Sequence, residues 1–557
     1  MFSKIRRFTD SRIALYTLIG ILSAVIFCVI FGTKVLNPTY TDWLLSESEL
    51  SQHYLGWRGF RASSWQFPIG MLDVLSYPNT TSVIFTDSIP VFAVLFKLLS
   101  PVLPSDFQYF GLWGITCFVL QGLFAGRIID RYSPNRIITV AASLLFPLAP
   151  VMINRMYWHT ALAGQWIILF ALDLVFNCEK YRSKKKTYLT ITLLGVLAAS
   201  IHIYFVLICG IVLVGYMIEE VLAYRNVKRV IAVLLDYLLS AAAVIYLLGG
   251  FSSHVEARNT GLGSFSFNLN GFFNPQGWSC VFKDRALYGD GQYEGFGYLG
   301  AACIFAGVLA FICFIGNSKS LKYLKENWKK ILALVFILLV SMVIAVSPVI
   351  TLDDKVIREF TFPGVITSIW SVFRCTGRLI WAAHYVIMLV SLIVIIKTFN
   401  KKTACIICIF LTAFQFFDIH EIIRQRRVRF NTVSEYRSLL ATEDFWNAVA
   451  ADEDIEHVVY FSTADIFMMY SLTDWAMDNG KTLNTFYFAR SIEESVIEAR
   501  AQSFNELSGD TVFIFKDSER IFCTEYPLHY YSVDGLIVGF TDELSGFEEM
   551  DSSEFCC

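Results

Sequence analysis

The stretch SELSQHYLGWRGFR, residues 48–61, concentrates side chains that could do chemistry. If it is helical, polar and aromatic side chains three and four positions apart share one face. That face, with a glycine beside a tryptophan, would suit the wall of a pocket for a sugar-like ligand. Alternatively, the stretch is an interfacial helix whose aromatic rings and arginines contact lipid headgroups. The candidate binding residues are Gln52, His53, Trp57 and Arg61, and Glu49 is a candidate catalytic group on the same face.

Two aspartates near this stretch are further candidates for acid–base catalysis. Asp42 lies in TYTDWLL, shortly after the first apolar segment, and Asp87 lies in VIFTDSIP. Carboxylates beside a bilayer are costly to desolvate and usually have a function there. Asp87 could also cap the helix that follows it, and the two roles are compatible. Asp42, Asp87, Glu49 and His53 together could hold a divalent cation, although no ligand spacing requires one.

Basic residues later in the chain could hold an anion. Arg374 and Arg378, in SVFRCTGRLIW, are four positions apart at the start of an apolar segment. Two guanidinium groups at this spacing on a helix could form a fork around a phosphate group. Contact with ordinary phospholipid headgroups is the alternative.

Two other segments contain candidate binding residues. His159, in MYWHTALAGQW, could line a cavity or make a hydrogen bond at a helix end. The glycine-rich segment GDGQYEGFGYLG contains Tyr293 and Glu294. It could form a hinged lid over an acceptor, because glycine permits hinge geometry and tyrosine stacks on sugars. It could equally be a turn packed against helices.

The composition shows what kind of protein must position these residues. Apolar residues make up 55% of the 557 residues, charged residues only 17%, and the mean hydropathy is +0.54. A soluble domain has about 25% charged residues, so this is the composition of a polytopic α-helical membrane protein. The sequence has no basic tail, zinc-type cysteine spacing or phosphate-binding glycine loop, which argues against a nucleic-acid partner. We expect about eleven transmembrane helices, at 13–31, 107–128, 137–153, 160–176, 187–200, 203–222, 230–248, 298–315, 331–349, 379–396 and 404–417.

Lysine and arginine cluster in alternate connections, which predicts a cytoplasmic N-terminus. This orientation requires the proline-flanked segment 89–103 to be a short helix in the outer leaflet, not a span. The large segments 32–106, 249–297 and 350–377 then lie outside, together with the candidate site residues.

The last quarter of the chain has a different composition. Residues 421–557 are charged and contain the strand-like runs HVVYFST, DTVFIFKD and GLIVGF, with a helical run at 491–507. We therefore expect a transmembrane domain at 1–420, with a large first outer loop at 32–106, and a small extracytoplasmic α/β domain at 421–557. In that compartment Cys523 could form a disulfide with Cys556 or Cys557.

The long first outer loop with acidic residues, the short helix ending in lysine and the span ending in GRIIDR resemble the GT-C superfamily of membrane glycosyltransferases. More narrowly, QHYLGWRGFR, FTDSIP, WHTALAGQWIIL, GQYEGFGYLG and FRCTGRLIW resemble one bacterial family of GT-C-like proteins without assigned function. In GT-C enzymes an acidic residue of the first outer loop is the general base, and basic groups of later loops hold the phosphate of a polyprenyl carrier. This sequence lacks the adjacent acidic pair that many members have near the first helix. It offers Asp42, Glu47 and Glu49 instead, and Asp87 is the second acidic candidate.

The resemblance implies an enzyme of the bacterial cytoplasmic membrane that transfers a sugar from a polyprenyl-phosphate donor. The acceptor would be an envelope glycan, lipid or protein on the outer face. Two alternatives remain open. One is a flippase for lipid-linked precursors, although such transporters typically have inverted repeats and charges at mid-membrane depth. The other is a non-catalytic envelope assembly protein whose α/β domain binds a partner.

Overall fold

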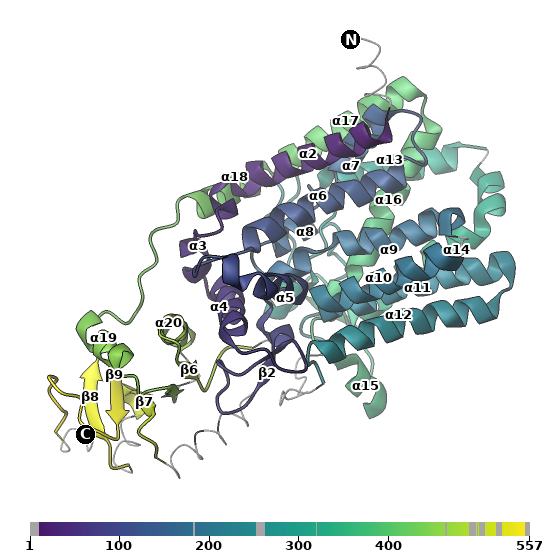
Figure 1. The fold of residues 1–557 in the computed structure, drawn as a ribbon. Coiled ribbons are helices and arrows are strands. Elements are labelled where there is room, and N and C mark those ends of the chain that lie inside the picture. The colour runs from purple at the N-terminus through teal and green to yellow at the C-terminus, as the bar shows by residue number, and fades with distance from the viewer. Residues whose placement is uncertain are drawn as a thin grey trace. The chain divides into compact units, whose positions relative to one another are not determined.

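The computed structural model describes residues 11–181, 184–251, 262–318, 320–371, 373–462, 465–488, 497, 500, 507–519 and 526–551 (Figure 1). The chain divides into two compact units, which we call the bundle unit and the sheet unit. The bundle unit comprises residues 1–38, 109–244 and 259–432, and the sheet unit comprises residues 39–108, 245–258 and 433–557.

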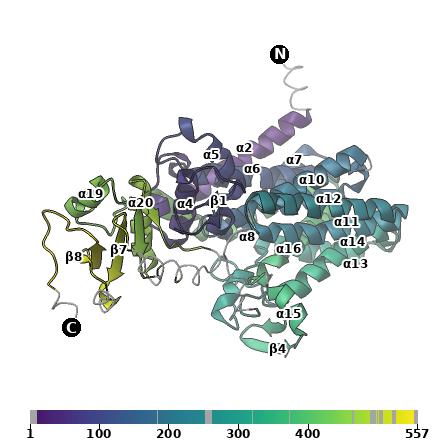
Figure 2. The ribbon, with the colours of Figure 1, turned by 60° about the horizontal axis from the view of Figure 1, so that its bottom comes forward.

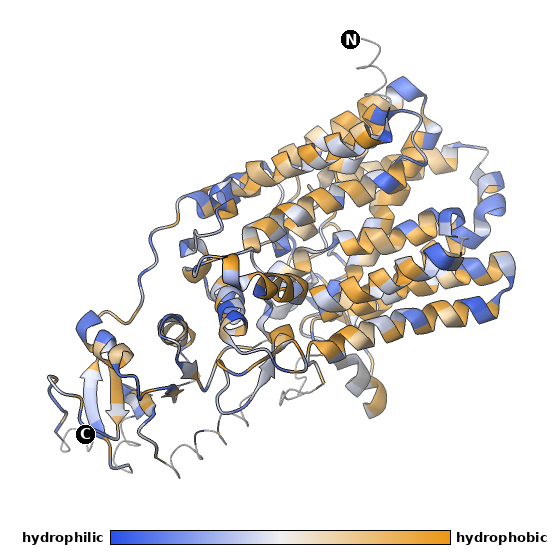
Figure 3. Ribbon diagram, in the orientation of Figure 1, coloured by the Kyte–Doolittle hydropathy of each residue, from blue (hydrophilic) through white to orange (hydrophobic). Residues whose placement is uncertain are grey.

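The bundle unit is helical, and its helices are mainly apolar (Figure 3). Its longer helices are α2 (Arg12–Phe31), α6 (Phe110–Ile129), α7 (Arg136–Leu144), α9 (Trp166–Phe176), α10 (Lys184–Ile201), α11 (Ile203–Tyr224), most of α12 (Val227–Leu247), α13 (Ala301–Gly316), α14 (Ser320–Val346), α16 (Trp381–Thr398), α17 (Lys401–Asp418) and α18 (His420–Asn431). Shorter elements are η1 (Lys34–Leu36), α8 (Pro150–Arg155), η4 (Thr160–Ala163), η5 (Cys178–Tyr181), η6 (Asp290–Gly295), α15 (Gly364–Ser371) and η7 (Thr376–Ile380).

Six helices of the described residues are long and apolar enough to cross a bilayer, or seven if the bent pair α17–α18 is one span. Each of the eleven segments predicted as spans contains at least one helix, but several of these helices are too short or too polar to meet that criterion. The predicted span 137–153 is two short helices, α7 and α8. Pro150 occupies the first helical position of α8, and proline is tolerated there but not inside a continuous helix.

Two connections of the bundle unit are held together by backbone hydrogen bonds. A hairpin of β3 (Val349–Leu352) and β4 (Lys355–Glu359) follows α14. Figure 2 shows β4 and α15 projecting from one end of the helices. The segment 262–297, which leads into α13, packs against this hairpin through the backbone hydrogen bond from Leu269 N to Thr351 O (3.0 Å).

The sheet unit contains a five-stranded mixed sheet of order β6-β5-β7-β9-β8. Strand β5 is parallel to β6 and β7, while β9 is antiparallel to β7 and β8. The three strand-like runs of the sequence form β5, β7 and β9, which confirms the predicted sheet. Most of the predicted helix 491–507 and Cys523, Cys556 and Cys557 lie outside the described residues. The elements are α19 (Glu443–Ala451), β5 (His457–Tyr460), α20 (Ile466–Asp478), β6 (Thr482–Leu483), β7 (Thr511–Lys516), β8 (His529–Val533) and β9 (Leu536–Phe540).

Residues 39–106 of the first loop also belong to the sheet unit. Its elements are α3 (Asp42–Leu45), α4 (Ser48–Ala62), β1 (Met71–Leu72), β2 (Thr81–Ser82), η2 (Val83–Thr86), α5 (Pro90–Leu98) and η3 (Ser100–Val102). Helix α5 has nine residues, so it is about 14 Å long and cannot cross a hydrocarbon core of about 30 Å.

Backbone hydrogen bonds join the first loop to the edge of the five-stranded sheet. Leu483 of β6 donates to Val74 O (2.8 Å) and accepts from Tyr77 N (3.1 Å). Tyr77 also stacks on His457, with ring centroids 3.6 Å apart. The structure therefore groups the first loop with residues 433–557, whereas the sequence analysis placed it with the membrane helices. The reason is main-chain pairing, which hydropathy does not reveal.

Candidate functional site

A buried ion cluster lies in the bundle unit. Arg155 ends α8, Glu294 lies in η6 and Arg378 lies in η7. Arg155 Nη1 is 2.7 Å from Glu294 Oε2, and Arg378 donates from Nε and Nη2 to the two carboxylate oxygens at 3.0 and 2.9 Å. The three side chains are 2%, 3% and 7% exposed. We call these three residues the Arg–Glu–Arg cluster.

Two glycines allow η6 and η7 to come together. A Cβ atom added at Gly377 would lie 2.5 Å from the Cα of Gly295, and one added at Gly295 would lie 2.4 Å from Ser266 O. Because each glycine immediately neighbours a cluster residue in sequence, this backbone approach places Glu294 beside Arg378. The glycine-rich segment thus acts as a close-packed turn, which was one of its two predicted roles.

Amide side chains fix the segment that contains η6. Gln292 Nε2 donates to the hydroxyls of Ser266 (3.1 Å) and Thr351 (2.7 Å). Its Oε1 accepts from Asn268 Nδ2 (2.9 Å) and Tyr288 N (3.0 Å). These four hydrogen bonds tie η6 to Thr351 of β3 and to the segment 266–288, so Glu294, two residues later, is held in a defined position.

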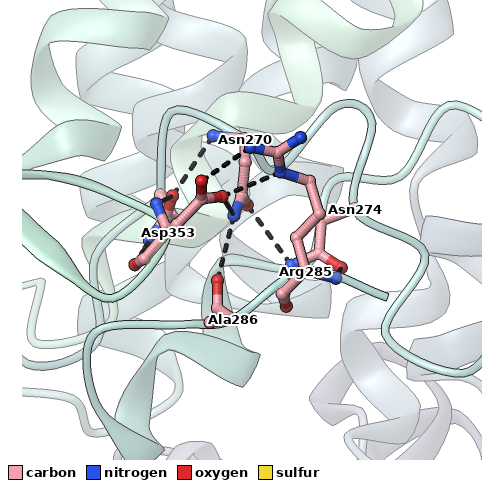
Figure 4. A network of polar contacts seen from close by, with 6 residues as sticks. Asn270, Asn274, Arg285, Ala286 and Asp353 are labelled. Atoms are coloured by element: carbon pink, nitrogen blue, oxygen red, sulfur yellow. Dashed lines mark hydrogen bonds and ion pairs between the residues drawn. The ribbon is translucent and has the colours of Figure 1, made fainter. Parts of the chain in front are cut away.

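A second network, shown in Figure 4, anchors the hairpin turn. Asn270 Nδ2 donates to Asp353 Oδ1 (2.8 Å) and to Ala286 O (3.0 Å). Arg285 makes a bidentate pair with the same carboxylate at 2.8 and 2.6 Å. The hydrogen bonds from Arg285 and Asn270 lower the pKa of Asp353 to about 2. This carboxylate is therefore ionised and serves as a structural clamp.

The Arg–Glu–Arg cluster has an excess of positive charge. Burial disfavours the ionised carboxylate, but Arg155 and Arg378 outweigh this and hold the pKa of Glu294 well below its usual range. Two guanidiniums and one carboxylate leave a net charge of +1 on groups that are almost fully buried. An uncompensated buried charge is costly, and an anionic ligand would offset the cost.

Arg378 retains a donor for such a ligand. Glu294 takes its Nε and Nη2, and the ring of Tyr204 lies 5.0 Å from its guanidinium carbon. Within the described part of the chain, Nη1 has no hydrogen-bond partner. The pair with Glu294 fixes the plane of the guanidinium, so Nη1 is a preorganised donor.

Two exposed aromatic rings lie next to the cluster in sequence and space. Trp158 is 40% exposed, Tyr293 is 45% exposed, and their ring centroids are 6.4 Å apart. His159 Nε2 lies 3.6 Å from Glu294 Oε1, and its Nδ1 lies 3.5 Å from Arg155 Nη1. A buried cationic cluster with exposed rings beside it could bind a ligand with an anionic group and a ring to stack.

Arg374 does not form the predicted fork with Arg378. Residues 374 and 375 are not helical; only residues 376–380 form η7. Arg374 is exposed, with its guanidinium carbon 4.5 Å from the centre of the Phe265 ring. The second guanidinium beside Arg378 comes instead from Arg155. Hydropathy would have pointed to Arg155, because an arginine at the end of an apolar segment needs a buried partner.

The first-loop candidates lie in the sheet unit. Helix α4 forms as predicted, and its face with Gln52, His53 and Trp57 is buried, not open. A Cβ atom at Gly56 would lie 2.5 Å from Thr86 Cβ, which shows how closely η2 covers this face. The role of this face as the wall of a ligand pocket stays a prediction.

Trp57 and Arg61 are used within the sheet unit. Trp57 Nε1 donates to Phe107 O at 3.0 Å. Arg61 donates to four carbonyl oxygens, those of Ser100, Leu103, Pro104 and Ser105, at 2.7–3.3 Å. Both side chains therefore stabilise the turn after α5.

The three acidic candidates are half-buried. Asp42 accepts from Tyr436 N at 3.0 Å, Glu49 lies in the first turn of α4, and Asp87 follows η2 with φ 54°. The residue at the N-cap position of α5 is Ile89, so Asp87 does not occupy it. Among the described residues, no three His, Cys, Asp or Glu side chains are arranged to hold a metal ion, so the suggested cation site of Asp42, Glu49, His53 and Asp87 is not formed.

The protein is therefore of the class of helical membrane proteins, with several candidate spans, a buried charged cluster and an α/β sheet unit. Residues 20–420 match the family model described as Domain of unknown function (DUF6311), and residues 445–541 match the DUF6311 C-terminal domain. The chain belongs to the DUF6311 family. A search of the curated proteins found no match.

A solved structure is similar over most of the chain. It is the crystal structure of the Archaeoglobus fulgidus oligosaccharyltransferase in the apo form, 10% identical, covering 95% of this chain and 75% of that chain. The TM-score is 0.43.

Proposed function

We propose that this protein is a membrane glycosyltransferase that takes a sugar from a polyprenyl-phosphate donor at the outer face of the bacterial cytoplasmic membrane. The acceptor is a glycan, lipid or protein of the envelope. The observation that carries the proposal is the Arg–Glu–Arg cluster, with its net positive charge beside the exposed rings of Trp158 and Tyr293.

The cluster suits the leaving group of this reaction. When the bond between the sugar and the phosphate oxygen breaks, the oxygen keeps the electron pair and negative charge grows on the phosphate. Arg378 Nη1 and the remaining charge of Arg155 would stabilise that charge without reorganising, because Glu294 already orients both guanidiniums. The aromatic rings would stack on the sugar.

Trp158, His159 and Tyr293 are the proposed sugar-binding side chains of the bundle unit. For the general base that accepts the proton of the acceptor hydroxyl, Asp87 is our first choice, and Asp42 and Glu49 are the alternatives. A positioned base contributes about 10²–10⁴-fold to the rate.

The test is transfer of labelled sugar by the purified full chain in nanodiscs from a panel of polyprenyl-phosphate donors. Arg378→Lys keeps the charge but loses the bidentate geometry, and we expect transfer to fall about 10²–10³-fold. Arg374→Gln is the matched control, since it removes an exposed guanidinium four residues away and should leave transfer within threefold. Equal losses in the two variants would contradict a phosphate-holding role for Arg378.

Asp87→Asn, run alongside with Asp42→Asn and Glu49→Gln, identifies the base. Loss of transfer with retained donor binding in one of the three variants assigns it. If no donor supports transfer while polyprenyl phosphate still binds to the wild-type cluster, glycosyl transfer is excluded and translocation of the lipid becomes the function to test.

A further inference from the structure

We infer that the groove between α2 and α18 is a binding site for one phospholipid of the surrounding bilayer that has an anionic headgroup. One of its acyl chains lies along α2, and its phosphate meets Arg427. The inference does not depend on the proposed function, because none of its residues belongs to the Arg–Glu–Arg cluster.

The groove has an apolar part on a candidate membrane span. Its volume is about 440 Å³, and α2 lines it with Ile21, Val25, Cys28 and Val29, which share one face of the helix. Ile21 is 56% exposed and Val25 is 50% exposed. From Ile21 to Val29 the helix rises by about 12 Å, which is most of the ~15 Å depth of one leaflet.

The polar end of the groove lies where α2 ends. Arg427 and Asn431, four residues apart on α18, line it there. Asn431 donates to Phe31 O (3.1 Å), the last residue of α2, and Gly32 follows with φ +78°. A Cβ atom at Gly32 would lie 2.2 Å from Asn431 Oδ1, so glycine is required for α18 to approach this closely. A lipid headgroup is expected at this depth, where the apolar helix stops.

Arg427 has donors left for a phosphate. Its Nη1 donates to Cys28 O (3.1 Å) and Val29 O (3.2 Å), two carbonyls of the last turn of α2. Its Nε and Nη2 have no partner among the residues that the structure describes. A guanidinium held by one nitrogen at an exposed position is well placed to bind a phosphate oxygen with the others.

The charge of α18 is complementary to an anionic headgroup. The helix HEIIRQRRVRFN carries four arginines and one glutamate, a net charge of +3. Arg424 pairs with Glu421 at 2.6–2.9 Å, so its charge is already compensated. Figure 3 shows the hydrophilic α18 beside the hydrophobic α2. Basic residues at a bilayer surface attract anionic lipids, whereas a zwitterionic headgroup would gain little.

The test uses the purified full chain, with retained lipid counted by native mass spectrometry and thermal unfolding measured with added phosphatidylglycerol or phosphatidylcholine. Wild-type protein should retain one phosphatidylglycerol and be stabilised by it more than by phosphatidylcholine. Arg427→Gln should lower retention at least fivefold. Arg424→Gln removes one charge from the same helix outside the groove and should stay within twofold of wild type.

Arg427→Gln could also lower lipid retention by weakening the contact between α2 and α18, so a second variant tests the groove without changing α18. Val25→Trp fills the apolar part at a half-exposed position and leaves α18 unchanged, and it should also lower retention at least fivefold. Equal losses in Arg424→Gln and Arg427→Gln would overturn the site in favour of general surface charge, and full retention by Val25→Trp would overturn the groove. Retention of undecaprenyl phosphate in place of phosphatidylglycerol would overturn the choice of a bilayer phospholipid.

Discussion

The bundle unit and the first loop of the sheet unit both contain arginines close to aromatic rings, but they use them differently. In the sheet unit Arg61 donates to four carbonyl oxygens, and Arg58 pairs with Asp474 and Asp478 of α20. In the bundle unit Arg155 and Arg378 share a single carboxylate and keep a net positive charge. The polar side chains of the first loop are paired within the sheet unit, whereas the Arg–Glu–Arg cluster holds an uncompensated charge in a fixed position, which is why we propose the cluster as the binding site.

The largest expected effect is at Glu294. Glu294→Gln leaves two buried guanidiniums without their carboxylate, which should cost about 3–5 kcal/mol in the free energy of unfolding. The control is Glu326→Gln. Glu326 forms an exposed i,i+4 ion pair with Lys322, so its loss should cost less than about 0.5 kcal/mol. Denaturant unfolding in detergent measures both, and similar values would show that the cluster is not a buried charged site.

The same residue predicts a pH dependence. Because the folded protein lowers the pKa of Glu294, its contribution to stability is complete above the unfolded value of 4.5 and is lost as the pH falls below it. Wild-type protein should therefore lose more stability than Glu294→Gln between pH 5 and pH 3. Parallel curves for the two proteins would contradict an ionised Glu294.

A smaller effect is expected at the glycine contact. Gly377→Ala forces η6 and η7 apart, and we expect a loss of about 1–3 kcal/mol and weaker binding of polyprenyl phosphate. Gly364→Ala is the control, since a Cβ atom there would have no neighbour within 4 Å. Unchanged lipid binding in Gly377→Ala would show that anion binding does not depend on the contact between Gly377 and Gly295.

In the sheet unit, Arg61→Gln should cost about 1–2 kcal/mol, because several carbonyl oxygens lose a donor at once. Binding of polyprenyl phosphate should not change. The matched variant is Arg437→Gln, at an exposed arginine of the same unit, which should be neutral in thermal unfolding. A loss of lipid binding in Arg61→Gln but not in Arg437→Gln would show that the first loop takes part in lipid binding.

The smallest effect is expected at Lys97, whose ammonium lies 4.2 Å from the Phe60 ring centre and 4.5 Å from that of Trp65. Burial lowers its pKa to about 8, with Asp73 opposing the shift. Because the fold lowers this pKa from its ordinary value of 10.5, Lys97 costs no stability above that pH. The cost grows as the pH falls from 10.5 through about 8. Lys97→Met should raise stability at pH 7 by less than about 1 kcal/mol, since the rings partly offset the penalty, and the gain should vanish above pH 10.

Periodicity predicted the local elements well, because it depends only on neighbouring residues. The helix considered for residues 49–60, the short helix expected within residues 89–103 and the three central strands all form. His159, Glu294 and Arg378 were chosen from their types and from their places at the ends of apolar segments, and the structure brings these three together. Their contact depends on Gly295 and Gly377, whose close approach joins segments about 80 residues apart.

Other features could not be predicted from one sequence. The pairing of Arg155 with Glu294 spans 139 residues, and no local pattern encodes it. The burial of His53 and Trp57 depends on η2 and on the turn after α5, which cover a face that looks open in the sequence. The same limit applies to the first loop, whose partner strand β6 has only two residues.

The backbone hydrogen bonds of Leu483 with Val74 and Tyr77 cannot form until strand β6 has been synthesised. The first loop emerges from the ribosome more than 300 residues before the strand that completes it. At about 5–20 residues per second, this interval is on the order of tens of seconds. During that time the loop has an unpaired backbone edge, so a nascent chain arrested before residue 480 should be cleaved in this loop by a protease that leaves the finished protein intact.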